Sequence, residues 1–225
     1  SNPWMAGNAG LFSVEFFENV RRALKPSGVL AQWFHTYEMD DATLSLVFNS
    51  LSAVFPRVTV WEMFPNDLLL VASEGSFNRD WERMEQLALT PEIKANLREG
   101  GLSGITDILS RQAMSVRGFE SIELTGSRRN TDDHPRLEYE APRSLYEKGK
   151  ATFLQRSSER TKVPGKGNLL LDEFSRNHRE LTLSELEALF VLHTIYPGAR
   201  DEYRGAILPE LIQRSSLSFQ IDVLF

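Results

Sequence analysis

The sequence predicts an α/β fold over its first third and a mostly helical remainder. Two observations support this division. Helix-like and strand-like apolar patterns alternate up to residue 76, and helical spacing dominates afterwards. A third observation is composition: 41% of the 225 residues are hydrophobic, which is enough to bury a core and argues against a disordered chain.

The first predicted element is an amphipathic helix over residues 11–24. Its apolar positions Phe12, Phe16 and Val20 recur at helical spacing, while charged residues occupy the opposite face. A Pro–Ser–Gly segment follows and ends the helix, because proline and glycine continue a helix poorly. The apolar run at residues 29–34 predicts a buried strand that packs against this helix.

A second helix is expected to start at an N-cap, Asp40 or Asp41, and to run to about Val54. Two strands near residues 58–63 and 68–72 follow, and the Pro–Asn–Asp turn between them predicts a β-hairpin. The order helix, strand, helix, hairpin predicts a parallel sheet that is completed by one antiparallel strand.

After the hairpin, short helices are expected around residues 81–89, 93–97 and 105–110. Near the end of the chain, Thr182 and Glu185 form a capping-box pair ahead of an apolar helix. The chain therefore divides into an α/β segment, an extension of helices and loops, a polar linker and a helical tail. These segments comprise residues 1–76, 77–154, 155–168 and 169–225.

Charge and residue content exclude several classes of function. The formal net charge of −6 argues against nucleic acid as a partner and is compatible with a cationic substrate. The absence of cysteine excludes disulfides, thiolate zinc sites and a cysteine nucleophile. The four histidines are scattered, so no metal site is expected.

The apolar runs are too short to cross a bilayer, and the first residues do not resemble a signal peptide. We therefore expect a cytoplasmic protein, or the cytosolic domain of a larger membrane-attached one.

No glycine-rich segment has the context of a nucleotide-binding loop, which follows a strand and opens a helix. The glycines of residues 100–104 follow a predicted helix and are better explained as its end. Those of residues 165–167 precede an apolar run. We therefore expect no cofactor-binding residues in this chain.

Three stretches of the sequence form a recognisable combination: residues 1–17, which begin Ser-Asn-Pro-Trp-Met-Ala-Gly, residues 24–33, which read Leu-Lys-Pro-Ser-Gly-Val-Leu-Ala-Gln-Trp, and residues 130–143, which begin Asn-Thr-Asp-Asp-His-Pro. Together they resemble spermidine synthase-like proteins of the class I methyltransferase fold. The resemblance covers roughly two thirds of the chain.

The resemblance implies that residues 29–34 are strand five of a seven-stranded Rossmann-like sheet and that the hairpin supplies the last two strands. The chain is then the carboxyl-terminal half of that fold followed by a helical extension. Strands one to four, with the cofactor-binding turn, would lie before Ser1.

The family's reaction is attack by an amine on a carbon next to a sulfonium. The resemblance therefore implies a small amine as substrate. It also implies decarboxylated S-adenosylmethionine as the donor of an aminopropyl group, or S-adenosylmethionine as the donor of a methyl group. We expect the full-length protein to use one of these cofactors, and this chain alone to bind neither and to be inactive.

Asn2 and Trp4 are candidate substrate-binding residues. The resemblance places them after strand four, at the edge of the sheet where such folds bind ligands. They also resemble the Pro–aromatic motif of amino-methyltransferases. A turn with a packed tryptophan is the structural alternative.

Gln32 and Tyr37 are further candidates for binding the amine, and Glu38 is a candidate catalytic carboxylate. Gln32 occupies the position where many spermidine synthases have glutamine. The family's glutamate two positions later is replaced by Phe34, which removes an acceptor for a cationic amine. Tyr37 and Glu38 follow in the next loop and could substitute for it; ordinary loop residues are the alternative.

Asp132 and Asp133 form the other candidate catalytic pair, because two adjacent carboxylates suit an ammonium group. Aspartates near a proline-containing turn also commonly cap the local backbone, which is the alternative.

Two other functions remain open at this stage. One is an S-adenosylmethionine-dependent amino-methyltransferase of the same fold, and the other is a non-catalytic module whose helical tail binds a protein. We also expect residues 29–34, as a strand without its neighbour, to pair in a homodimer or with the missing amino-terminal half.

Overall fold

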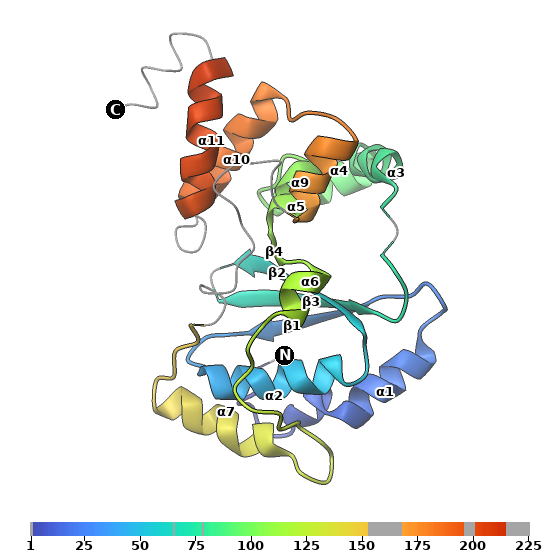
Figure 1. Ribbon diagram of the computed structural model, residues 1–225, viewed down its shortest axis with the longest axis vertical. Coiled ribbons are helices and arrows are strands. Elements are labelled where there is room, and N and C mark those ends of the chain that lie inside the picture. The colour runs from blue at the N-terminus through green and yellow to red at the C-terminus, as the bar shows by residue number, and fades with distance from the viewer. Residues whose placement is uncertain (1, 65, 78, 153–167, 196–200, 215–225) are drawn as a thin grey trace. The chain divides into compact units, whose positions relative to one another are not determined.

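A computed structural model describes residues 2–64, 66–77, 79–152, 168–195 and 201–214 (Figure 1). The chain forms two compact units. The first, called the sheet unit, comprises Ser1–Phe77 and Ala113–Ser158. The second, called the helical unit, comprises Asn78–Gln112 and Glu159–Phe225.

Four strands form one sheet in the order β1-β3-β2-β4. β3 is antiparallel to both β1 and β2, so β1 and β2 run parallel to each other with β3 between them. This arrangement differs from the expected parallel sheet, because β1 and β2 are not neighbours and each is hydrogen-bonded to the antiparallel β3. The strand bounds are β1 Leu30–His35, β2 Arg57–Phe64, β3 Asp67–Ser73 and β4 Gln112–Met114.

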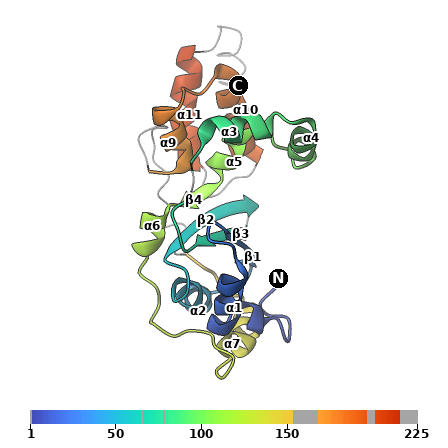
Figure 2. The same ribbon diagram turned by 90° about the vertical axis from the view of Figure 1, so that its right-hand side faces the viewer.

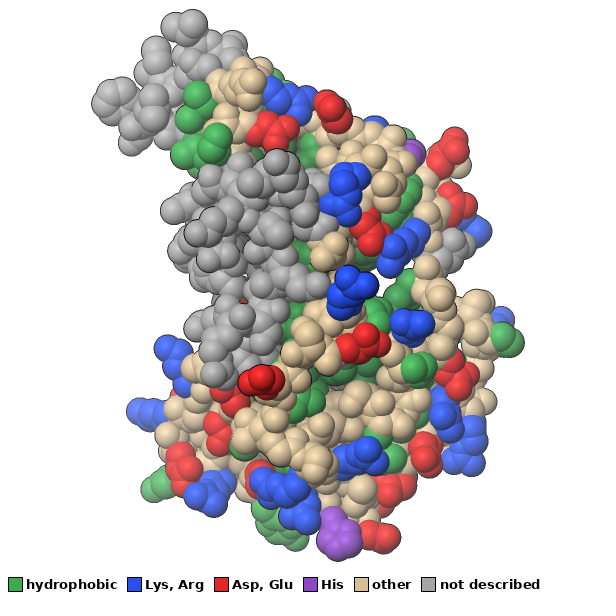
Figure 3. Space-filling model, viewed as in Figure 1, with side chains coloured by type: hydrophobic (Ala, Val, Ile, Leu, Met, Phe, Trp, Pro, Cys, Tyr) green, Lys and Arg blue, Asp and Glu red, His purple; other side chains and the backbone are tan. Residues whose placement is uncertain are grey.

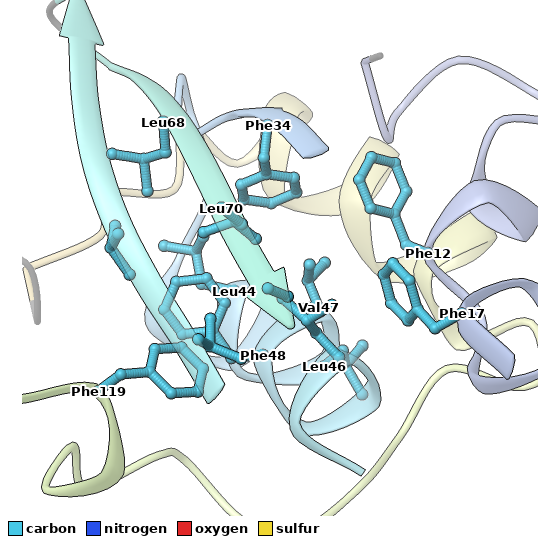
Figure 4. Packing of buried hydrophobic residues seen from close by; sticks show 14 of the residues in the cluster. Phe12, Phe17, Phe34, Leu44, Leu46, Val47, Phe48, Leu68, Leu70 and Phe119 are labelled. Carbon is cyan, nitrogen blue, oxygen red and sulfur yellow. The ribbon is translucent and has the colours of Figure 1, made fainter. Parts of the chain in front are cut away.

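One face of the sheet is buried because apolar residues alternate along its strands. The strand register places Phe34 opposite Leu68, and Val60 opposite Leu70, and all four side chains are almost fully buried. Figure 4 shows Phe34, Leu68 and Leu70 turned toward helix α2, Asp41–Ser52. α1, α2 and α7 all lie on this side of the sheet (Figures 1 and 2).

The first helix is shorter than expected. A 3₁₀ turn at Ala9–Phe12 comes first, and α1 spans Val14–Ala23 because Ser13 caps it, accepting a hydrogen bond from the Phe16 amide at 3.1 Å. This break rotates the buried face. Phe17, rather than Phe16, is fully buried beside Phe12.

α2 begins as expected. The Asp40 carboxylate accepts a hydrogen bond from the Thr43 amide at 2.7 Å, which identifies Asp40 as the N-cap. The Asp41 carboxylate instead accepts hydrogen bonds from the amide and hydroxyl of Thr152. The helix ends at Ser52, two residues before the expected end.

Three elements of the sheet unit were not predicted from the sequence: β4, α6 (Val116–Glu120) and α7 (Arg136–Tyr146). β4 has three residues, all buried, so it shows no alternation. α7 contains Pro142, a residue that normally indicates the end of a helix.

The helical unit confirms the three short helices expected after the hairpin. Gly100 and Gly101 end α4 as expected, because Gly101 has φ 70° and the Leu102 amide donates to the Leu97 carbonyl at 2.8 Å. The described helices are α3 Trp81–Ala88, α4 Pro91–Glu99, α5 Ile105–Ser110, α9 Leu170–Asn177, α10 Leu183–Ile195 and α11 Asp201–Arg214.

The capping box at the start of α10 is confirmed: the Thr182 hydroxyl accepts from the Glu185 amide at 3.2 Å, and the Glu185 carboxylate accepts from the Thr182 amide at 2.8 Å. Arg179 then joins α10 to α3, because its guanidinium donates to both Glu185 and Glu85. His178 contacts Glu85 at 2.7 Å. We call Glu85, His178, Arg179 and Glu185 the charged network.

The sheet unit is interrupted after Phe77 and resumes at Ala113, so residues 77–154 are divided between the two units. Almost all of the expected linker at residues 155–168 lies outside the described residues. Basic and acidic side chains are interspersed over the face shown in Figure 3.

Among the described residues, no helix is both long enough and apolar enough to cross a membrane.

Candidate functional site

Four aromatic rings meet at the carboxyl end of β1. The Trp4 ring stacks on the imidazole of His35, with centroids 5.8 Å apart and planes inclined by 24°. Trp33 approaches His35 edge-on at 4.0 Å, and Tyr37 approaches Trp4 edge-on at 6.2 Å. We call Trp4, Trp33, His35 and Tyr37 the aromatic cluster.

The sheet register explains the position of His35. His35 lies opposite Asp67 on β3, and its Nδ1 contacts the Asp67 carboxylate. The hairpin turn before Asp67 is also tied to β1, because the Thr36 amide donates to the Asn66 carbonyl at 2.7 Å. Asn66 has φ 68°, a conformation that asparagine tolerates well.

The loop that carries Tyr37 and Glu38 is fixed by the end of α7. The Glu38 carbonyl accepts a hydrogen bond from the Ser144 hydroxyl at 3.1 Å, and that hydroxyl accepts one from the Asp40 amide at 2.9 Å. A Cβ atom at Gly149 would lie 2.9 Å from the Asp40 nitrogen, so only glycine permits this approach.

Backbone strain is present in the same loop. Glu38 has φ 49°, which is uncommon for a residue other than glycine and is often found at binding sites. The charge of Glu38, together with a hydrogen bond to it, raises the pKa of the Tyr37 hydroxyl. Tyr37 therefore keeps its proton at neutral pH.

The segment that carries Trp4 is also fixed by the chain around α7. The Gly7 amide donates to the Glu138 carboxylate at 2.8 Å. The side-chain amide of Asn130, fully buried, donates to the Ala9 carbonyl at 2.8 Å, and its carbonyl accepts from the Leu137 amide at 3.0 Å. Residues 130–144 thus position both the Trp4 segment, through Asn130 and Glu138, and the Tyr37 loop, through Ser144.

The arrangement suits a cation. Aromatic faces attract ammonium groups, and Asp67 and Glu38 place two carboxylates next to the rings. A primary amine has both the charge for the carboxylates and an alkyl chain for the apolar ring faces.

The structure brings together three of the candidate residues, Trp4, Tyr37 and Glu38. Asn2 belongs to the same segment as Trp4; its backbone carbonyl accepts from the Met5 amide, and its Oδ1 is buried with no hydrogen-bond partner among the described residues. Gln32 is half-buried on the face of the sheet opposite to His35, and its side-chain amide donates to the Trp33 carbonyl.

Asp132 and Asp133 lie in an exposed loop, where the Asp132 amide donates to the Glu15 carboxylate at 3.0 Å. No contact among the described residues joins either carboxylate to the aromatic cluster. Asn130, two residues earlier, is the buried structural residue of this loop.

Sequence reasoning missed His35, Asp67 and Trp33 as site residues. His35 and Asp67 meet only because β1 pairs with β3, a pairing between segments about thirty residues apart. The signal that could have found them is the register, since both residues lie at the same end of paired strands.

Within the part of the chain that the structure describes, no group of three or more His, Cys, Asp or Glu side chains is arranged to hold a metal. No family model matches the chain, and neither curated proteins nor solved structures include a significant match.

Proposed function

We propose that this chain is the carboxyl-terminal part of a spermidine synthase-like transferase, and that the aromatic cluster with Glu38 and Asp67 binds its amine acceptor. The single observation behind this proposal is that three residues singled out through the resemblance, Trp4, Tyr37 and Glu38, meet at the carboxyl end of β1.

The order of elements supports the same proposal. The resemblance implies strand five, a helix and a hairpin that supplies the last two strands, and β1, α2, β2 and β3 follow that order. The first and third resembling stretches also contact each other, through Gly7 with Glu138 and Ala9 with Asn130.

In the proposed reaction the amine nitrogen attacks a carbon beside the sulfonium of the cofactor, and the sulfur leaves as a neutral thioether. The cofactor supplies this electrophile. The residues of this chain would orient the amine: the ring faces of Trp4 and Tyr37 against its alkyl chain, and Glu38 against its charged nitrogen.

A second candidate, an S-adenosylmethionine-dependent amino-methyltransferase, is favoured by Phe34. The side chain of Phe34 is fully buried 5.4 Å from the Phe12 ring, so this position contributes no carboxylate to the acceptor site. Incubation of the full-length protein with each cofactor and an amine separates the two candidates. Aminopropyl transfer releases methylthioadenosine, and methyl transfer releases S-adenosylhomocysteine.

Acceptor binding can be tested on the chain alone by titrating it with 1,4-diaminobutane and recording tryptophan emission. We expect a saturable change that depends on Trp4. Trp4→Phe should remove most of the change, whereas Trp81→Phe in the helical unit should retain it.

A charge-matched pair of variants controls for non-specific electrostatics. Glu38→Gln should weaken diamine binding about tenfold or more, because a charge-assisted hydrogen bond is lost. Glu123→Gln removes the same charge from an exposed loop position and should leave affinity unchanged. An emission that stays constant up to diamine concentrations on the order of 10 mM would refute the proposed binding site.

A further inference from the structure

His35 and Asp67 form a pair that the proposed amine-binding role does not by itself explain. The two side chains are mostly buried, with exposures of 23% and 19%, and both contacting atoms, Nδ1 of the imidazole and Oδ1 of the carboxylate, are inaccessible to solvent. Trp4 and Trp33 restrict the imidazole from two sides. The ring therefore has one fixed orientation.

A carboxylate on Nδ1 determines the proton position on a neutral imidazole. Because a carboxylate only accepts, a neutral imidazole that donates to Asp67 through Nδ1 has its lone pair on Nε2. The same logic operates in catalytic triads, where a buried aspartate holds a histidine in the tautomer that acts as a base. His35 thus has the features of a positioned base next to the rings of the aromatic cluster.

We propose that the His35–Asp67 pair accepts the proton that an ammonium group must lose before it becomes a nucleophile. This inference rests on the proposed function. The ammonium N–H bond breaks, and its proton moves to Nε2 of His35, which leaves a neutral amine and an imidazolium stabilised by Asp67. The amine lone pair then forms the new N–C bond as the C–S pair departs to sulfur, and His35 later releases its proton to water.

The other titratable groups at the site have different roles. Tyr37 keeps its proton because Glu38 raises its pKa, so it does not act as a base at neutral pH. Glu38 lies in the strained loop after β1 and accepts a hydrogen bond from Tyr37. His35 is the group whose orientation is fixed by a buried carboxylate.

The first test is the tautomer of His35, read from imidazole ¹⁵N resonances of the chain at pH 8. We expect a protonated Nδ1 and an unprotonated Nε2. Asp67→Ala should shift His35 toward the Nε2-protonated form that dominates in free imidazole side chains. The exposed His134 in the same unit serves as an internal control and should be unaffected by this substitution. A wild-type His35 that is protonated on Nε2 would overturn the inference.

The second test compares 1,4-diaminobutane with its bis-trimethylammonium analogue, which has the same charge but no N–H. We expect both ligands to alter tryptophan emission, and only the primary amine to move the His35 Nε2 resonance toward that of a protonated nitrogen. If both ligands alter the emission and neither moves the Nε2 resonance, the proton-accepting role is wrong while the proposed amine site stands. If neither ligand alters the emission, the proposed function fails and this inference fails with it.

Discussion

Buried neutral side chains join several distant segments of the sheet unit, whereas partly exposed charges join α3 and α10 in the helical unit. In the sheet unit, Asn130 and Ser144 hydrogen-bond to backbone groups more than a hundred residues away. In the helical unit, Arg179 lies between Glu85 and Glu185. Neutral buried groups do not titrate and fix backbone positions closely, which suits the loops around a binding site. A charged network depends on pH and salt.

The largest expected effect concerns the core of the sheet unit. Phe17→Ala should lower the free energy of unfolding by roughly 3–5 kcal/mol, because the ring is fully buried. Phe16→Ala, the matched control on the next position of α1, should cost clearly less because Phe16 is only half-buried. Chemical denaturation of both variants checks this order, and equal losses would show that the two positions share the core.

The second effect concerns the buried hydrogen bonds of Asn130. Asn130→Ala should cost about 2–4 kcal/mol, since the Ala9 carbonyl and the Leu137 amide would lose their buried partner. Hydrogen exchange should show the loss of protection in the sheet unit. Protection lost only in the helical unit would contradict the conclusion that Asn130 stabilises the sheet unit.

A smaller effect is expected for the charged network. Arg179→Met keeps much of the apolar stem but leaves Glu85 and Glu185 without their shared partner. Because Arg179 is about one-third exposed, solvent screening reduces the loss, and we expect roughly 1–2 kcal/mol. Thermal melts at low and high salt measure it, and a loss that did not shrink with salt would argue against an electrostatic origin.

The smallest effect is the pH dependence of the same network. Burial opposes ionisation of Glu85 and Glu185, but the hydrogen bonds that each carboxylate accepts outweigh burial and lower its pKa. Glu85 accepts from His178 and Arg179. Glu185 accepts from Arg179 and Thr182. A lowered folded-state pKa adds stability above the unfolded value of about 4.3, and this stability is lost as pH falls through the folded values.

The helical unit should therefore lose stability as the pH falls from about 5 to below 4. In Arg179→Met this contribution to the acid dependence should be smaller. Denaturation of both proteins across this range, followed by hydrogen exchange in α3 and α10, provides the measurement. An unchanged acid dependence in the variant would show that Arg179 does not lower these pKa values.

Local signals in the sequence predicted much of the fold. The caps at Asp40 and Thr182 and the glycine end of α4 were correct because each depends on residues within one helical turn. The shift from Phe16 to Phe17 was missed because Ser13 restarts the helix after a 3₁₀ turn. Helical spacing alone does not reveal such a break.

Non-local features could not be predicted in the same way. β4 gives no periodic signal, and the proline in α7 conceals a helix. The candidate site shows the same limit: the approach of Tyr37 to Trp4 depends on contacts that both segments make with α7, and the contact of His35 with Asp67 depends on the strand register.

α7 makes the two walls of the candidate site mechanically dependent on each other. Glu138 fixes the segment that carries Trp4, and Ser144 fixes the loop that carries Tyr37. The two anchors are six residues apart on one helix, which corresponds to an axial rise of about 9 Å. A substitution that tilts or slides α7 would therefore move both walls together. The distance between the Trp4 and Tyr37 rings should therefore change when α7 residues that contact neither ring are substituted. This makes α7 a natural place to engineer the site.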